Sequence, residues 1–178
     1  MSIFVNTVDS IGDEALTNSI IDRSITEILD NYATSIGNYA FYGCTALTTA
    51  DFQAATSIGN YAFSDCSKLT TVKFQAATRI GNGAFTGCSA LTTADFPAMT
   101  SISGYAFDGC TALTTLILRS GTMATLSGAQ IFKNTPILSG TGYIYVPAAL
   151  VDSYKAATNW STYANQIRAI EDYPEICG

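Results

Sequence analysis

Hydrophobic and polar residues alternate along the middle of the chain in a pattern that returns every 22 positions. Residues 35–100 hold three near-copies of one segment: SIGNYAFYGCTALTTADFQAAT, SIGNYAFSDCSKLTTVKFQAAT and RIGNGAFTGCSALTTADFPAMT. Each copy places Ile, Phe, Cys and Leu at the same four positions, and a fourth copy continues from Ile102 to Leu113. Self-similarity at a fixed period of this length predicts a solenoid of stacked coils.

Each copy predicts one coil made of three parts. The segment LTTADF at residues 47–52 predicts a short strand with its leucine, alanine and phenylalanine facing inward. Residues 57–59, Ser-Ile-Gly, predict a brief second extended piece whose glycine permits a bend. Residues 60–66 predict a short α or 3-10 turn with its alanine, phenylalanine and cysteine inward. Such a coil needs neighbours on both sides to bury its faces.

The ends of the chain depart from this repeat. The segment SIGDEAL at residues 10–16 matches SIGNYAF at residues 35–41 with an offset of 25, which predicts a first coil with a longer helical segment. At the other end, YIYV at 143–146 predicts a strand, Pro147 begins a helix, and residues 167–170 predict a last edge strand before a tail. We therefore expect one domain over residues 1–178: an atypical first repeat and cap (1–34), four regular repeats (35–119), an atypical fifth repeat (120–147), and a helical cap with a tail (148–178).

Composition and charge exclude several classes of function. The net charge is −6 with only eight Lys plus Arg and no basic run, so the electrostatic footprint of a nucleic-acid-binding protein is missing. No stretch of about 18 apolar residues occurs, so we expect no membrane insertion. The first residues, MSIFVNTVDSIGDEA, show neither a charged region nor an apolar core of a signal peptide.

The outward positions of the predicted strands form the candidate partner-binding face. If every second strand residue faces inward, the others build two columns along the stack, which we expect to form a concave surface. The candidate residues are Thr49, Thr71, Thr93 and Thr115 in one column, Asp51, Lys73, Asp95 and Ile117 in the other, and Gln53, Gln75 and Arg119 beside them. Flat threonine arrays bind ice in some β-solenoids, but there both columns are threonine, whereas here the second is charged. The alternatives are a face that binds a protein or a surface glycan, and a solvated stacking surface without a partner.

Four cysteines are predicted to form another column, one per coil: Cys44, Cys66, Cys88 and Cys110. Their expected spacing of about 4.8 Å is within reach of a disulfide or a thiolate metal site. The alternative is a set of buried small hydrophobic side chains. This second interpretation is favoured because the chain has no His and no C-x-x-C motif, so we expect no metal and no cofactor. Cys177 is predicted to be an exposed thiol in the tail.

Tyrosines mark a third column, Tyr39, Tyr61 and Tyr105, which is interrupted at Gly83. It is either an adhesion surface or a shield for the neighbouring backbone. The aromatic residues of the C-terminal part are expected to cap the open last coil: Tyr143, Tyr145, Tyr154, Trp160 and Tyr163. Without His there is no Ser/His/Asp or Cys/His set. Gly37, Gly59 and Gly81 recur one per coil and form no glycine-rich phosphate-binding loop, so we expect no enzyme.

The motif I-G-x-x-A-F-x-x-C-x-x-L resembles the BspA-type class of leucine-rich repeats, also described from a treponemal surface antigen. Four tandem matches carry the resemblance: Ile36–Leu47, Ile58–Leu69, Ile80–Leu91 and Ile102–Leu113. With degenerate flanks it covers residues 10–147, and the ending from Tyr145 to Ile170 resembles the helical C-terminal cap of such proteins in gut bacteria.

The resemblance implies a right-handed leucine-rich-repeat solenoid, an α/β fold rich in β-structure, built from 22-residue coils with short strands and short α or 3-10 turns and capped at both ends. It also implies adhesion or protein recognition at the cell surface or after secretion. We therefore expect a non-enzymatic recognition scaffold of adhesin-like character. The alternative is a stalk or spacer module of a larger cell-surface or phage-related assembly. The sequence leaves the oligomeric state open.

Overall fold

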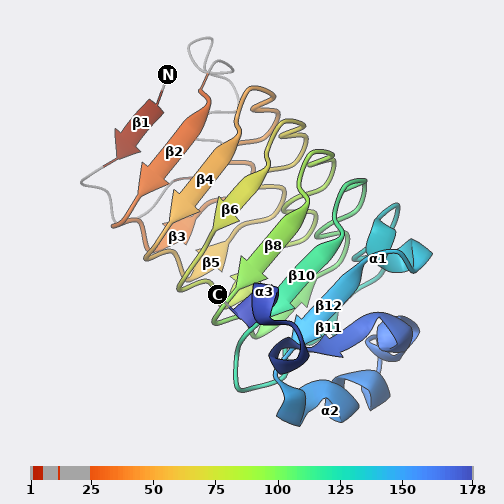
Figure 1. The fold of residues 1–178 in the computed structure, drawn as a ribbon. Coiled ribbons are helices and arrows are strands. Elements are labelled where there is room, and N and C mark those ends of the chain that lie inside the picture. The colour runs from red at the N-terminus through yellow and green to blue at the C-terminus, as the bar shows by residue number, and fades with distance from the viewer. Residues whose placement is uncertain (1, 6–11, 13–24, 178) are drawn as a thin grey trace.

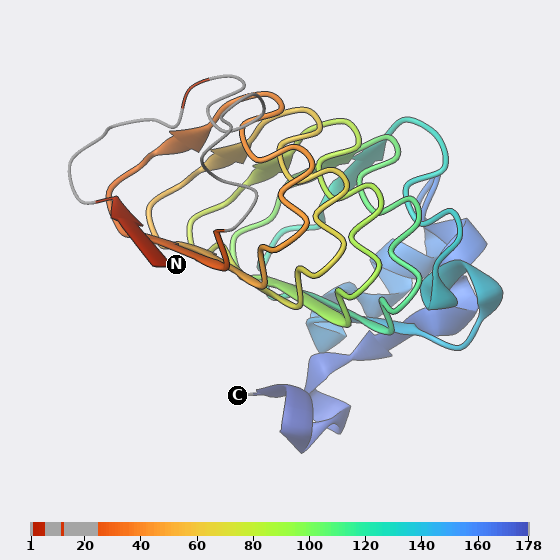
Figure 2. The ribbon, with the colours of Figure 1, turned by 90° about the horizontal axis from the view of Figure 1, so that it is seen from above.

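The chain winds into a stack of coils, and each regular coil adds one strand to each of two parallel sheets (Figure 1). The computed structural model describes residues 2–5, 12 and 25–177 of the 178. The two sheets face each other across the interior of the coils, as the view from above shows (Figure 2). This arrangement agrees with the β-rich solenoid that the 22-residue period predicts.

The first sheet has eight strands in the order β1-β2-β4-β6-β8-β10-β12-β13, all paired in parallel. The strands are β1 (Ser2–Val5), β2 (Glu27–Asp30), β4 (Thr49–Phe52), β6 (Thr71–Lys73), β8 (Thr93–Phe96), β10 (Thr115–Leu118), β12 (Tyr143–Val146) and β13 (Ile167–Ala169). We call it the long sheet. Its register keeps the sequence period, since Thr49 pairs with Thr71 and Asp51 with Lys73.

The second sheet has five shorter strands in the order β11-β9-β7-β5-β3. They are β3 (Ser35–Ile36), β5 (Ser57–Ile58), β7 (Arg79–Ile80), β9 (Ser101–Ser103) and β11 (Thr125–Ser127). In each regular coil the single isoleucine of this strand is buried and its neighbours are not. The expected second extended piece of the coil is therefore confirmed.

The interior between the sheets is built from columns of identical side chains. Phe63, Phe85 and Phe107 stack on one another with ring centroids 5.5 Å apart at each step and planes nearly parallel. A second phenylalanine column from the long sheet includes Phe52 and Phe74, whose centroids are 5.6 Å apart. Nearly all of these side chains are completely buried, in one continuous core. Such columns pack densely because successive coils have the same shape, so each phenylalanine ring stacks on the equivalent ring of the next coil.

Between the sheets, each regular coil makes short turns with i to i+3 hydrogen bonds, the bonding of a 3-10 turn, as the sequence predicts. The turn amides point alternately to the next coil, as when Tyr39 N donates to Asn60 O at 2.8 Å and Phe41 N to Ala62 O at 2.7 Å. This alternation uses left-handed backbone at two positions per coil. The first holds Tyr39, Tyr61, Gly83, Tyr105 and Gln130, and the second holds Gly43, Asp65, Gly87, Gly109 and Asn134, all with φ between 54° and 75°.

At the N-terminal side, β1 and β2 extend the long sheet. Glu27 pairs with Thr49 and Ile28 with Ala50, so the atypical first repeat enters the sheet in the expected register. Its expected helical segment, in residues 10–24, lies outside the described residues except for position 12. Asp30 pairs with Phe52 and is likewise buried.

The helices lie at the C-terminal side and close the stack. They are α1 (Pro136–Ser139), the 3-10 helix η1 (Ala148–Leu150), α2 (Val151–Ala156), and the 3-10 helices η2 (Ser161–Gln166) and η3 (Ile170–Asp172), followed by α3 (Pro174–Cys177). Trp160 Nε1 donates to Ala124 O at 2.7 Å, and Ala124 N donates to Tyr154 OH at 2.8 Å. Tyr154 and Trp160 thus cap the last coil and satisfy its backbone, and Tyr163 meets Phe132 edge-on, as the sequence predicts. Tyr143 and Tyr145, which the sequence predicts in the cap, lie instead on β12 in the long sheet, where they pair with Thr115 and Ile117. No helix of the described chain has the length and apolar character needed to cross a membrane.

The residues after Ile170 do not form the tail that the sequence predicts. They fold back as η3 and α3 onto the outer side of the long sheet, away from the interior between the sheets (Figures 1 and 2). The side chain of Cys177 lies outside the described residues, so its expected exposure stays a prediction.

Candidate recognition face

The outer side of the long sheet carries the candidate residues in the expected columns. The pairing places Thr49 beside Thr71 and Thr93 beside Thr115, while Asp51, Lys73, Asp95 and Ile117 follow one another in the second column. Leucine, alanine and phenylalanine of the same strands are buried on the inner side. We call this surface the outer face.

The outer face is open and charged where the coils are regular. Lys73 Nζ lies 3.7 Å from Asp51 Oδ2, and its side chain is 56% exposed. Gln53 Nε2 donates a hydrogen bond to Asp51 Oδ1, which orients the carboxylate from the other side. An ion pair this exposed adds little to stability, so it leaves Lys73 able to exchange Asp51 for another anionic partner.

A shallow hollow of about 360 Å³ lies on this open part of the outer face. It is lined by Thr70, Thr71, Val72, Lys73, Gln75, Thr93 and Asp95. Hydroxyl, amide, ammonium and carboxylate groups therefore border one depression across β6 and β8. Five of the predicted candidate residues lie on its rim: Thr71, Lys73, Gln75, Thr93 and Asp95.

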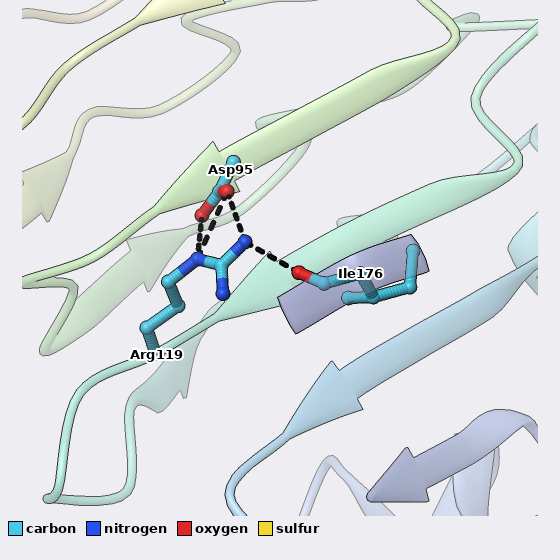
Figure 3. A network of polar contacts seen from close by, with 3 residues as sticks. All are labelled: Asp95, Arg119 and Ile176. Atoms are coloured by element: carbon cyan, nitrogen blue, oxygen red, sulfur yellow. Dashed lines mark hydrogen bonds and ion pairs between the residues drawn. The ribbon is translucent and has the colours of Figure 1, made fainter. Parts of the chain in front are cut away.

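The same face is covered where it reaches the C-terminal cap. Ile117 is only 5% exposed, because it packs with Tyr145 and Ile170 in a second apolar cluster that Tyr173 and Ile176 complete. Arg119 Nη2 donates to Asp95 Oδ2 at 2.8 Å and to the carbonyl oxygen of Ile176 at 2.7 Å (Figure 3). Two of the candidate residues, Ile117 and Arg119, thus contact the chain's own C-terminal segment.

Sequence reasoning missed several outer-face residues. Glu27 continues the threonine column, and Leu29 continues the column of Asp51. Tyr143 and Tyr145 continue the two columns at the other end. The offset of 22 between Glu27 and Thr49 was a usable signal, but the irregular spacing to Tyr143 hides its place in the column.

The cysteine column is part of the core. Cys44, Cys66, Cys88 and Cys110 are buried thiols, not disulfides. Cys88 Sγ donates to Phe63 O at 3.1 Å, and Cys110 Sγ donates to Phe85 O at the same distance, which satisfies a carbonyl of the preceding turn. Burial raises the pKa of the Cys110 thiol to about 12. The neutral thiol is therefore a small hydrophobic group with one useful donor, and the buried interpretation of the column is confirmed.

The tyrosine column shields backbone and also holds exposed rings. Tyr39 stacks on Tyr61 with ring centroids 5.1 Å apart and planes at 16°. The ring of Tyr61 lies over Gly83, where a Cβ atom would come within 2.4 Å of Tyr61 Cε1. Asn82 Nδ2 donates to Tyr61 OH at 2.9 Å and holds the ring in place. Gly83 is thus required by the tyrosine of the preceding coil, which explains the interruption in the column.

Among the described residues, no group of three or more His, Cys, Asp or Glu side chains converges in a way that could hold a metal ion. The carboxylates of the outer face lie one per coil and contact Lys73 and Arg119 rather than each other. The arrangement is that of a rigid polar surface.

Comparison with known proteins agrees with the repeat geometry. A family model described as "BspA type Leucine rich repeat region (6 copies)" matches residues 2–114, more than half of the chain. The chain belongs to the BspA-type leucine-rich-repeat family. A leucine-rich-repeat family suggests a protein-interaction scaffold. A search of curated proteins finds no match.

Three solved structures are similar to this BspA-type chain in fold. A leucine-rich cell surface protein from Faecalibacterium prausnitzii A2-165 is 24% identical, with a TM-score of 0.63 over 91% of this chain and 43% of that one. A leucine-rich-repeat protein from Bacteroides ovatus ATCC 8483 is 22% identical, with a TM-score of 0.58 over 89% and 45%. The T. pallidum leucine-rich-repeat protein is 20% identical, with a TM-score of 0.53 over 82% and 63%. The chain thus spans between 43% and 63% of the length of these proteins.

Proposed function

We propose that this chain is a non-enzymatic, adhesin-like scaffold that binds a protein partner on the open part of the outer face, between β4 and β8. The observation that carries the proposal is the hollow across β6 and β8, with Lys73 and Asp95 on one rim and Thr71 and Thr93 on the other. The regular sheet holds these groups at fixed spacing, so a partner binds without the cost of ordering the surface.

The charge pattern supports a protein rather than a nucleic acid or an anionic membrane as the partner. The open part of the outer face alternates Asp51, Lys73 and Asp95, and the chain has a net charge of −6. A surface with both signs of charge at strand spacing matches the mixed polar side chains of a protein surface.

A protein-array screen of the intact chain tests the proposal. Thr71→Glu with Thr93→Glu adds two negative charges to the hollow, and we expect it to lose the partners that the parent binds. The matched control, Ser57→Glu with Ser101→Glu, adds the same charge to the opposite sheet on both sides of Arg79. This control should keep those partners. Loss of partners in the control alone, or in neither variant, would overturn the proposed site.

A structural spacer is the second candidate function, and one observation favours it. Threonine hydroxyls run along the stack as a ladder, in which Thr56 donates to Thr34 O and Thr78 to Thr56 O, both at 3.1 Å. Such uniform coil-to-coil bonding suits a stiff connector. A chain that binds no array protein but tolerates the Thr71 and Thr93 changes in an assembled complex would support the spacer instead.

A further inference from the structure

The C-terminal segment, residues 170–177, lies on the outer face as a ligand lies on a binding site. Its apolar side chains do not enter the main core but form a separate cluster with Ile117 and Tyr145. In the regular coils the equivalent positions of that column are Asp51, Lys73 and Asp95. The outer face thus changes from charged to apolar where this segment covers it.

Three contacts define the chemistry of this site. The ring of Tyr173 meets that of Tyr145 edge-on, with centroids 5.1 Å apart. Ile176 packs against the same cluster, and its backbone carbonyl accepts a hydrogen bond from Arg119 Nη2 at 2.7 Å. Ile176 N donates to Tyr173 O at 2.8 Å, which closes a turn and brings the two side chains to one side.

Charge complements these contacts. The segment IEDYPEICG contains three acidic residues and no Lys or Arg. Two arginines lie on the sheet beside this segment. Arg119 forms an ion pair with Asp95, and the guanidinium of Arg168 lies 4.7 Å from the Tyr143 ring centroid. Burial and Glu175 of the segment raise the pKa of Tyr145 while Arg168 of the sheet lowers it, so both charged side chains lie close to that ring. Glu171 Oε2 accepts a hydrogen bond from Ala148 N at 2.9 Å. An acidic turn thus lies on an apolar centre that has a basic side chain beside it.

We propose that Ile117, Tyr145 and Arg119 form a docking site for an acidic peptide turn of a partner protein with an aromatic and an aliphatic residue three positions apart. In this structure the chain's own residues 173–176 occupy that site. The inference rests on the proposed function, because it assigns the class of partner and its regulation to the same outer face. The segment is short and outside the main core, so it opens at a lower cost than global unfolding. An incoming turn of the same chemistry then takes its place.

The test uses the full chain with Tyr173→Ser and Ile176→Ser, which empties the site without truncation. The probe is a synthetic peptide of residues 169–176, AIEDYPEI, titrated to millimolar concentration while amide NMR shifts of β10 and β12 are followed. We expect saturable binding to the double variant. Binding to the parent should be at least about tenfold weaker, because its own segment competes at millimolar effective concentration. Parent and double variant that respond equally to the peptide would overturn the proposal.

Two further changes in the double variant locate the binding. Arg119→Gln should weaken the peptide about tenfold, since it removes a charge-assisted bond to the peptide carbonyl. Lys68→Asp, at an exposed position outside both the hollow and the covered part of the face, should leave peptide affinity unchanged. A peptide with serine in place of its tyrosine and isoleucine should not bind. Undiminished binding after Arg119→Gln, or of the serine peptide, would overturn the site, as would a parent that is a dimer with exchanged segments.

The peptide and array results together distinguish failure of the docking site from failure of the proposed function. Peptide binding together with a failed array screen would overturn the proposed function of the hollow and leave the docking site standing. If Thr71→Glu with Thr93→Glu loses the array partners but the peptide does not bind, the docking site is overturned and the proposed function of the hollow stands.

Discussion

Arg119 and Asp95 are joined by a forked ion pair across β10 and β8, with Nη2 2.8 Å and Nε 3.0 Å from Oδ2. The same guanidinium holds the carbonyl of Ile176, so one side chain links the open part of the outer face to its covered part (Figure 3). Removing the carboxylate should therefore loosen the C-terminal segment, even though Asp95 does not touch it.

Asp95→Asn should speed hydrogen exchange of the Tyr173 and Ile176 amides by roughly fivefold, as expected for about 1 kcal/mol lost from a pair whose side chains are 28% and 34% exposed. Both amides are hydrogen-bonded within the segment, to Ile170 O and Tyr173 O. Asp51→Asn is the matched control, because Asp51 pairs with Lys73 in the regular part of the face. Equal exchange in the two variants would contradict the link through Arg119.

Gly59→Ala should destabilise the fold by roughly 1–3 kcal/mol, the usual cost of overpacking. A Cβ atom at Gly59 would lie 2.5 Å from the backbone carbonyl carbon of Gly37, and backbone cannot rotate away as a side chain can. Gly121→Ala is the control, since nothing lies within 4 Å of its Cβ position. Urea unfolding of both variants checks the prediction, and a neutral Gly59→Ala would show that the coils can separate at no cost.

Stability should fall as the pH rises above about 9. The folded chain holds the Cys110 pKa at about 12 against an ordinary 9.0, so the unfolded chain loses this proton first. The contribution of the neutral thiol is complete below pH 9 and is lost between pH 9 and pH 12, at up to about 1.4 kcal/mol per pH unit.

Cys110→Ala isolates this effect. The variant should be less stable than the parent at pH 7, because the bond to Phe85 O and some packing are lost. Its stability should then decline less steeply above pH 9. Alkylation at pH 9 followed by mass spectrometry checks that the four column thiols of the folded parent stay unlabelled. Identical slopes for parent and variant would contradict the burial of a neutral thiol.

Gln130→Gly should stabilise the chain by about 0.5–1 kcal/mol. Gln130 is exposed and has a left-handed backbone with φ 57°, where glycine has no steric penalty. Gly109→Ala provides the opposite change, since Gly109 has φ 75° and alanine there should cost about 1 kcal/mol. Thermal unfolding of the two variants should therefore shift in opposite directions. A shift in the same direction would contradict the strain argument.

The 22-residue period was enough to predict the register and the core. Identical residues at a fixed offset must stack, so Thr49 beside Thr71, the buried phenylalanines and the buried cysteines all followed from spacing. Ile117 already stood out in the sequence as an apolar residue in a charged column. What covers it was not predictable, because residues 170–177 are too short to show a helical or strand periodicity.

Other features could not be predicted from the sequence because they depend on contacts between neighbouring coils. Gly59 was interpreted as a bend, yet its reason is the backbone of Gly37 at 2.5 Å from its Cβ position. The left-handed backbone at Tyr39 and Tyr61 could not be predicted from the sequence, because that conformation is usually associated with Gly, Asn or Asp. Such positions become visible only when the neighbouring coil is in place.

Photo-crosslinking of an array partner to the intact chain tests the central claim most directly. A benzophenone amino acid placed at Thr93, on the rim of the hollow, should crosslink to that partner. The same amino acid at Ser101, on the opposite sheet of the next coil, should not. Crosslinks from Ser101 but not from Thr93 would contradict the assignment of recognition to the outer face of the long sheet.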